Sequence, residues 1–245
     1  MKNIFVFDVD NTLTPPRQKI TDDMKTLFKA FIKKNKVYLV SGSDFEKIVW
    51  QLGREITGDV QGVYGCLGNT LHIKNKLSHL NEFSELESLE LLNDIKKYIN
   101  ESLTPVKTGN HVEIRIGMIN ISTIGRNASI EQRKIYSEFD KQNSERKIFA
   151  DFLSNKYPKL DISIGGEISI DISVKGHAKE QIYNKILRGE EDSTIIFFGD
   201  RCNVGGNDHS LAKLVKLDNG IVFNVDSYTD TKQILQRIWN GDCTI

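Results

Sequence analysis

The stretch Ile4-Phe5-Val6-Phe7-Asp8-Val9-Asp10-Asn11-Thr12-Leu13-Thr14 decides the fold of this 245-residue chain. Its four leading apolar residues predict a buried strand, which ends in two carboxylates, Asp8 and Asp10. Ligands of open α/β sheets bind at this carboxyl edge. Two like charges so close together require a cation or a shared proton, so we expect Mg²⁺ there and one Asp free to attack phosphorus. For this motif alone, an ordinary strand followed by a solvated, Asp-rich turn is an equal alternative.

Composition narrows the class of protein. The 33 basic and 33 acidic residues cancel, and a neutral chain lacks the basic excess of nucleic-acid binders. The chain contains no run of 18 apolar residues, so we expect no membrane partner, and its first residues lack signal-peptide features. Three scattered cysteines (Cys66, Cys202 and Cys243) favour a reduced, cytoplasmic compartment over a disulfide frame or a zinc site.

The apolar patterns predict an α/β chain that is interrupted by a second unit. Alternating strands and helices near both ends predict a parallel sheet with crossover helices. The middle of the chain differs, because strictly alternating strands there predict an antiparallel sheet with one solvated face. The expected strands are 4–7, 36–40, 112–116, 194–198 and a pair within 160–174 that turns at Gly165-Gly166. The expected helices are 22–34, 44–52, 84–100, 129–155 and 178–188.

We therefore expect a core made of residues 1–82 and 176–245, with an α+β cap domain at 83–175. An insertion at this place is a candidate lid over the active site. Further polar residues lie where strands end or helices begin: Ser41, Ser43, Lys179, Asp200 and Asp208. A carboxylate nucleophile, a hydroxyl, an ammonium group and further carboxylates for Mg²⁺ are the parts that phosphoryl transfer requires. Each of these residues alone has an ordinary structural explanation, but their combination favours a phosphotransferase.

The order of these motifs resembles that of the haloacid dehalogenase superfamily. The run Phe7–Ile20 is closer still to the eukaryotic-type phosphomannomutase family, which reads nearly F-D-V-D-G-T-L-T-x-x-R-Q-K-I there. The resemblance implies a Rossmann-like core, Asp8, Asp10 and Lys179 as catalytic residues, and Mg²⁺ bound by Asp8, Asp10, Asp200 and Asp208. It also implies that Asp8 forms an aspartyl-phosphate while Asp10 acts as acid and base. Either Ser41 or Ser43 would bind the phosphoryl group.

The cap segment carries the most specific part of this resemblance. Three of the nine arginines fall within residues 115–133, although the chain contains 24 lysines. Guanidinium presents a planar fork to phosphate, which ammonium cannot do. The resemblance implies that Arg115, Arg126 and Arg133 bind the distal phosphate, that Arg17 also binds substrate, and that Ser169 and Asp171 contact sugar hydroxyls. For Arg133, a solvated charged helix face is the alternative.

The family resemblance implies a phosphomannomutase that interconverts mannose 6-phosphate and mannose 1-phosphate, with hexose 1,6-bisphosphate as activator and intermediate. It further implies a role in the mannose metabolism that leads to GDP-mannose, and a homodimer formed through the cap. The alternatives are a sugar-phosphate phosphatase of the same superfamily and a non-catalytic sugar-phosphate binding protein. The sequence does not choose between mannose and glucose. The segment after Asp208 departs from the family, so we assign no second cation.

Overall fold

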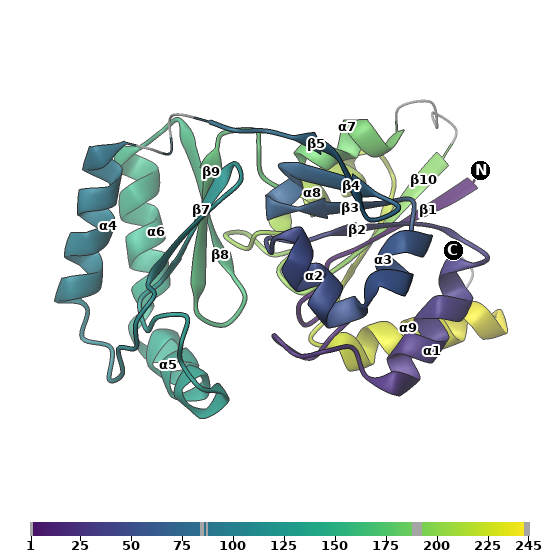
Figure 1. Ribbon diagram of the computed structural model, residues 1–245, viewed down its shortest axis with the longest axis horizontal. Helices are drawn as coiled ribbons and strands as arrows, with labels where there is room; N and C mark the ends of the chain where they lie inside the picture. Colours follow the sequence, from purple (N-terminus) through teal and green to yellow (C-terminus); the bar gives the residue numbers. More distant parts are fainter. Residues whose placement is uncertain (1, 84–85, 87, 188–192, 243–245) are drawn as a thin grey trace.

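The computed structural model describes residues 2–83, 86, 88–187 and 193–242, and it contains two separate sheets (Figure 1). The larger sheet has seven strands in the order β11-β10-β1-β2-β3-β4-β5, and the smaller has four in the order β6-β7-β9-β8. The smaller sheet comes from a segment inserted between β5 and β10. The predicted α/β class, with a Rossmann-like core and a cap built on an antiparallel sheet, is confirmed.

The larger sheet is parallel except at one edge. Its parallel strands are β1 (Lys2–Phe7), β2 (Lys36–Val40), β3 (Gly62–Gly65), β10 (Ser193–Gly199) and β11 (Ile221–Asn224). The antiparallel edge is a hairpin of β4 (Thr70–Ile73) and β5 (Lys76–Leu80). Its turn residues Lys74 and Asn75 both have positive φ, as a two-residue hairpin turn requires. The hairpin was not predicted, because the turn lacks the glycine that usually marks this geometry.

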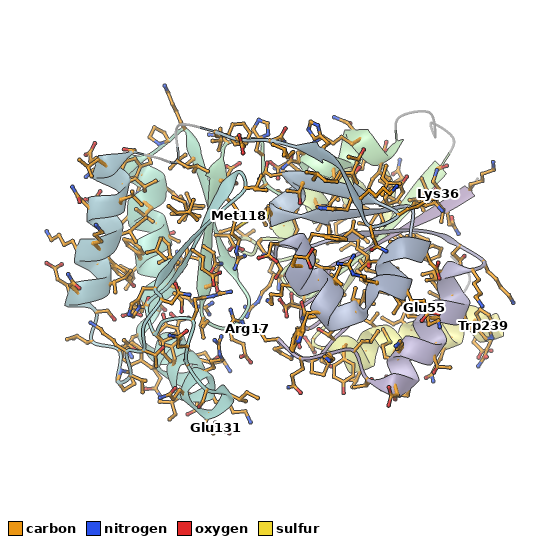
Figure 2. All side chains as sticks on the ribbon, in the orientation of Figure 1. Arg17, Lys36, Glu55, Met118, Glu131 and Trp239 are labelled. Atoms are coloured by element: carbon orange, nitrogen blue, oxygen red, sulfur yellow. The ribbon has the colours of Figure 1, made fainter. Side chains whose placement is uncertain are left out.

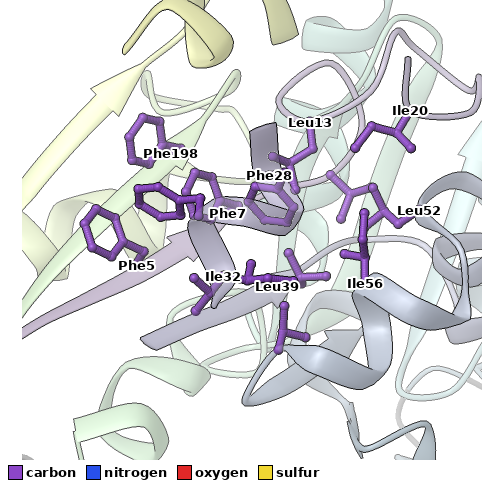
Figure 3. Packing of buried hydrophobic residues seen from close by; sticks show 14 of the residues in the cluster. Phe5, Phe7, Leu13, Ile20, Phe28, Ile32, Leu39, Leu52, Ile56 and Phe198 are labelled. Atoms are coloured by element: carbon purple, nitrogen blue, oxygen red, sulfur yellow. The ribbon is translucent and has the colours of Figure 1, made fainter. Parts of the chain in front are cut away.

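Helices cover both faces of the larger sheet, which explains the uninterrupted apolar sequence of β1. Phe5 and Phe7 face one layer, where Phe7 packs against Phe28 and Phe5 against Phe31 of α1 (Figure 3). Ile4 and Val6 face the other layer. The first layer contains α1 (Asp22–Ile32), α2 (Phe45–Leu52), α3 (Arg54–Asp59) and α9 (Tyr228–Asn240). The second contains α7 (Gln181–Leu187) and α8 (His209–Leu217). Packing on both faces holds the strands in place, and the site residues that follow the carboxyl ends of these strands are held with them.

The smaller sheet has one apolar and one polar face. Its strands are β6 (Val112–Arg115), β7 (Met118–Ser122), β8 (Leu160–Gly165) and β9 (Ser169–Val174). The apolar face packs against α4 (Leu89–Glu101) and α6 (Glu145–Lys156), which lie on its outer side in Figure 1. On the opposite face, antiparallel register aligns Glu113, Asn120, Asp171 and Ser163 in one row across the strands. This polar row belongs to the face that borders the site.

Several predicted helices differ in extent from those of the structure: the one expected at 22–34 ends at Ile32, and the one expected at 178–188 begins at Gln181. The helical stretch 129–155 consists of α5 (Ile130–Asn143) and α6, because Ser144 between them adopts a left-handed conformation. The helix expected at 84–100 begins at Leu89, after Ser88 as its N-cap, and positions 84, 85 and 87 lie outside the described residues. Likewise, residue 188, the expected end of α7, and Cys243 lie outside them. The boundaries of core and cap stay a prediction. Within the described part of the chain, no helix combines the length and apolar character needed to cross a membrane.

Candidate active site

A cavity of about 290 Å³ lies between the carboxyl ends of β1, β2 and β10 and the polar face of the smaller sheet. Figure 2 shows Arg17 in the space between the two parts of the molecule. The cavity is lined by every predicted site residue except Lys179 and Asp208, which are buried beside Asp8. Residues far apart in the sequence, from Asp8 to Asp208, thus meet in one place. Most of them follow a strand or project from the polar face of the smaller sheet, and Arg133 comes from α5 (Ile130–Asn143).

Three carboxylates form the floor of the site. Oxygen atoms of Asp8, Asp200 and Asp208 all lie within 4.8 Å of one another. Burial raises the pKa of Asp8 well above its usual value, and Asp208 and Asp200 add to this against the opposing charge of Lys179. Burial and the charge of Asp208 likewise raise the pKa of Asp200 to about 6. A cation would relieve this repulsion, and Mg²⁺ prefers oxygen ligands, so these carboxylates suit the predicted metal site.

Lys179 connects two of these carboxylates. Its side chain is fully buried, and its Nζ donates hydrogen bonds of 2.6 Å to Asp8 Oδ1 and of 2.6 Å to Asp208 Oδ1. Burial opposes the charge of the lysine, but the two carboxylates outweigh it and raise the lysine pKa. Asp208 Oδ2 also accepts a hydrogen bond from the backbone N–H of Arg201 at 3.0 Å. Lys179 lies two residues before α7, in a turn, and orients the Asp8 carboxylate.

The carboxylate of Asp10 is bound by a different set of groups. Its Oδ2 accepts a hydrogen bond from Lys47 Nζ at 3.0 Å, while its Oδ1 accepts from Gln51 Nε2 at 2.8 Å and from the backbone N–H of Arg17 at 2.9 Å. Burial would raise the Asp10 pKa, but the charge of Lys47 and these hydrogen bonds lower it to about 2. Asp10 is therefore ionised here, and it must accept a proton before it can donate one. Its side chain is separate from the Asp8–Asp200–Asp208 cluster, so any role in metal binding would come from its backbone carbonyl.

Lys47 and Gln51 were not predicted from the sequence. Both lie on α2, four residues apart, so they share one helix face. Asp44 caps this helix by accepting a hydrogen bond from the Lys47 N–H, and the helix therefore begins directly after the Ser41–Ser43 loop. The sequence did contain one indication of their role: two polar residues lie on the same face of the helix that follows the second strand.

Ser41 and Ser43 are both buried and both line the cavity. The hydroxyl of Ser41 accepts a hydrogen bond from the Ser43 N–H at 3.1 Å, and the hydroxyl of Ser43 accepts one from Lys47 Nζ at 3.0 Å. Each hydroxyl still carries a hydrogen that it can donate to a phosphoryl oxygen. Both residues therefore remain candidates for that contact.

The cap arginines are fixed by hydrogen bonds to other protein groups. Arg115 Nη1 donates to the carbonyl of Gly42 at 2.6 Å and so joins the cap to the Ser41–Ser43 loop. Arg126 Nη1 donates to Asn120 Oδ1 at 2.7 Å and to Ser169 Oγ at 2.9 Å. Such contacts restrict the guanidinium groups before any ligand arrives, which lowers the entropy cost of binding.

Arg133 lies on α5, and its buried side chain is fixed by two backbone carbonyls close to it in the sequence. Its Nε donates to the carbonyl of Ala128 at 2.9 Å, and its Nη2 donates to the carbonyl of Arg126 at 2.8 Å. The solvated-face alternative for Arg133 is therefore wrong. Burial and the neighbouring Arg17 and Arg115 lower the Arg126 pKa to about 10, and burial together with Arg133 lowers that of Arg17 to about 10. This crowding of positive charge favours an anion.

Asp171 links the cap to the core. Asn120 Nδ2 donates to its Oδ1 at 2.6 Å from the neighbouring strand, and Asn207 Nδ2 donates to its Oδ2 at 3.0 Å from the loop after β10. Nearby, the Ile164 N–H donates to the carbonyl of Gly205 at 2.8 Å. The sequence analysis did not identify Asn120 or Asn207, although Asn120 belongs to the same alternating pattern as Arg115.

The fold and the site together define the class of protein. The chain has the fold of the haloacid dehalogenase superfamily. It superimposes on a subclass IIB sugar phosphatase of that superfamily with a TM-score of 0.57, 15% identity, and coverage of 99% of both chains. It also superimposes on an IMP-nucleotidase of Plasmodium falciparum with a TM-score of 0.63, 16% identity, and coverage of 98% of this chain and 68% of the other.

Sequence comparison gives the particular family. The family model for eukaryotic phosphomannomutase matches residues 24–241. Phosphomannomutase 2 of Dictyostelium discoideum is 35% identical over 241 residues, which cover 95% of this chain and 94% of the relative. A phosphomannomutase of Triticum aestivum is 35% identical over 240 residues, with coverage of 96% and 94%. The chain belongs to the eukaryotic phosphomannomutase family.

Proposed function

We propose that this protein is a phosphomannomutase, an isomerase that interconverts mannose 6-phosphate and mannose 1-phosphate through a hexose 1,6-bisphosphate. One observation carries the proposal: a single cavity is lined both by the carboxylate nucleophile Asp8 and by a cluster of mutually repelling arginines, Arg17, Arg115, Arg126 and Arg133. A mutase substrate must present either of its ends to the nucleophile. The arginine cluster supplies a second phosphate site, which binds the phosphate at the opposite end of the sugar in each of the two transfers.

The chemistry begins with Asp8, which attacks the phosphorus of the bisphosphate: the bond between phosphorus and the sugar oxygen breaks, an aspartyl-phosphate forms, and a hexose monophosphate is the leaving group. Lys179 holds the Asp8 carboxylate in place at 2.6 Å and, with Ser41 or Ser43, donates hydrogen bonds to the phosphoryl oxygens. Asp8, Asp200 and Asp208 would hold Mg²⁺, which would supply charge neutralisation for phosphoryl transfer.

Asp10 acts on the sugar oxygen. It protonates the leaving sugar oxygen in the first transfer, and in the second transfer it accepts the proton of the attacking hydroxyl. Since the Asp10 carboxylate is ionised when held by Lys47 and Gln51, it must take up a proton before the first transfer. Release from Lys47 would raise its pKa and favour the acid form. Ser169 and Asp171, on the cap side of the cavity, contact sugar hydroxyls.

The cap excludes water from the aspartyl-phosphate. Cap and core are joined at the site by Arg115 to Gly42 and by Asn207 to Asp171, and a closed cavity favours transfer to a sugar hydroxyl over hydrolysis. A sugar-phosphate phosphatase would use the same floor residues with water as acceptor. The arginine cluster favours the mutase, because a monophosphate needs only one phosphate site.

The assembly and the cellular role follow from the family. We propose a cytoplasmic homodimer formed through the cap, which supplies mannose 1-phosphate for GDP-mannose synthesis. The cap strand β6 is the edge of its sheet, and its Ile114 side chain is 71% exposed, as a strand that pairs with a second copy would be. Light scattering of the Ile114→Asp variant against wild type tests this: the variant should be monomeric, and a wild-type monomer contradicts the proposal.

Conversion of mannose 1-phosphate, with and without a catalytic amount of hexose 1,6-bisphosphate, tests the proposed function. We expect mannose 6-phosphate to form, faster with the bisphosphate, and Asp8→Asn to abolish the conversion. If wild type releases only inorganic phosphate, the protein is a phosphatase. If Asp8→Asn retains substantial turnover with contamination excluded, the nucleophile is wrong.

A further inference from the structure

Glu113 lies at the cap arginines, where a negative charge opposes phosphate binding. It precedes Arg115 by two residues on β6, so both side chains lie on the same face of the sheet. Its Oε2 accepts a hydrogen bond from Arg115 Nη2, and its Oε1 lies 3.3 Å from Arg126 Nε. One carboxylate therefore pairs with two of the three cap arginines.

The carboxylate of Glu113 lies behind these arginines. Among the described residues, Arg115 and Arg126 line the cavity and Glu113 does not. The arginine side chains are only 9% and 8% exposed, against 30% for Glu113. Phosphate in the cavity would thus contact the guanidinium groups directly, and Glu113 would act only through them.

The two arginines need such a partner because they repel each other. Arg115 and Arg17 both lower the pKa of Arg126, whereas Glu113 raises it. Arginine side chains are long and lose considerable rotamer freedom when they are fixed. The Gly42 carbonyl holds one edge of Arg115, and Asn120 with Ser169 holds Nη1 of Arg126. Glu113 faces both groups: it accepts a hydrogen bond from Nη2 of Arg115, and it forms an ion pair of 3.3 Å with Nε of Arg126, a buried atom that has no hydrogen-bond partner among the described residues.

We propose that Glu113 is a positioning residue that fixes the separation and orientation of Arg115 and Arg126, so that their remaining N–H groups converge on one phosphate. The inference rests on the proposed function for its consequence in catalysis. Its geometric content concerns phosphate binding alone and can be tested without turnover. If Glu113 only balanced positive charge, any negative side chain at this position would serve. If it positions the arginines, both the charge and the length of the Glu side chain are required.

Two variants and a matched control separate these roles. Glu113→Gln keeps the length and removes the charge, and Glu113→Asp keeps the charge and shortens the side chain by one methylene. Glu138→Gln makes the same charge change at an exposed position of α5. For each protein, the increase in unfolding midpoint caused by inorganic phosphate is measured without divalent cations, because a ligand stabilises the state that binds it. KM and kcat for mannose 1-phosphate are then measured.

If Glu113 positions the arginines, both Glu113 variants show a smaller phosphate-induced increase than wild type and Glu138→Gln. Their KM rises on the order of tenfold, more than kcat falls, while the midpoint without phosphate stays near that of wild type. A larger phosphate effect in Glu113→Gln would overturn the proposal, since removal of a simple counter-charge strengthens anion binding. The proposal would also be overturned if the phosphate-induced increase in Glu113→Asp equalled that of wild type, or if the increase in both Glu113 variants equalled that of Glu138→Gln. Loss of cooperative unfolding in the Glu113 variants would overturn it as well. If wild type has no mutase activity, the proposed function fails, and the phosphate-induced stabilisation still decides the role of Glu113.

Discussion

Replacement of Lys179 by methionine perturbs the site at its most buried charge. The lysine side chain is fully inaccessible and forms hydrogen bonds of 2.6 Å to each of Asp8 and Asp208. Methionine has a similar length and no charge, so the packing is largely kept while both ion pairs are lost. Two buried carboxylates then remain next to each other without their cation.

The expected loss of stability is large. Removal of one partner from a buried ion pair costs about 3–5 kcal/mol, because the other charge stays buried and unpaired. Lys179 has two such partners, but protonation of Asp8, whose pKa is already raised, offsets part of the cost. We therefore expect a loss of about 3–5 kcal/mol in the free energy of unfolding. Mutase turnover should fall by about two to three orders of magnitude, as when a donor to transition-state charge is removed.

Urea denaturation without divalent cations measures the stability, and a mutase assay measures the turnover. Lys213→Met, at an exposed position of α8, is the control and should be nearly neutral. Addition of Asp208→Asn to Lys179→Met should restore part of the stability, because one of the two unpaired carboxylates becomes neutral. A Lys179→Met variant that loses less than about 1 kcal/mol, or a double variant less stable than Lys179→Met, would refute this reasoning.

Four further predictions concern other parts of the molecule. Asp10→Ala should lower mutase turnover by about two to four orders of magnitude and also lower the unfolding midpoint, because Lys47 and Gln51 lose their partner; near-normal turnover would rule out the acid and base role. Arg126→Lys should raise the inorganic phosphate released per mutase turnover, because ammonium cannot replace the guanidinium fork, and rates equal to wild type would mean that Arg126 is not a phosphate ligand. Mg²⁺ should raise the unfolding midpoint of wild type and have less effect on Asp200→Asn; equal effects would place the metal elsewhere. Cys66 and Cys202 should resist iodoacetamide at neutral pH until urea is added, since burial raises the pKa of Cys66 to about 11 and that of Cys202 above its usual value; mass spectrometry of the native protein would reveal early modification.

The sequence predicted those features of the site that depend on strand ends. Asp8, Ser41 and Asp200 each follow an apolar run, and parallel strands bring their carboxyl ends to one edge. The contacts of Asp10 were not predictable in this way, because Lys47 and Gln51 reach it from the side of a helix rather than from a strand end.

The cap shows a similar division. The alternation of residues 112–116 predicted the two faces of the strand, and Arg115 was recognised by its residue type. Glu113 precedes Arg115 by two residues and so lies on the same face of the strand, but a carboxylate does not indicate phosphate binding. Its pairing with Arg126 depends on the path of the loop that carries Arg126, which the sequence does not show. The break at Ser144 was also hidden, since positive φ at a serine has no reliable sequence marker.

The fate of the transferred phosphoryl group tests the central claim most directly. Mannose 1-phosphate is incubated with the protein, Mg²⁺ and a catalytic amount of hexose 1,6-bisphosphate that carries labelled phosphate, and the products are separated over time. The proposed pair of phosphate sites in one cavity predicts that the label appears in hexose monophosphates, mannose 6-phosphate among them, with little in inorganic phosphate. Label released mainly as inorganic phosphate, without formation of mannose 6-phosphate, would contradict the account.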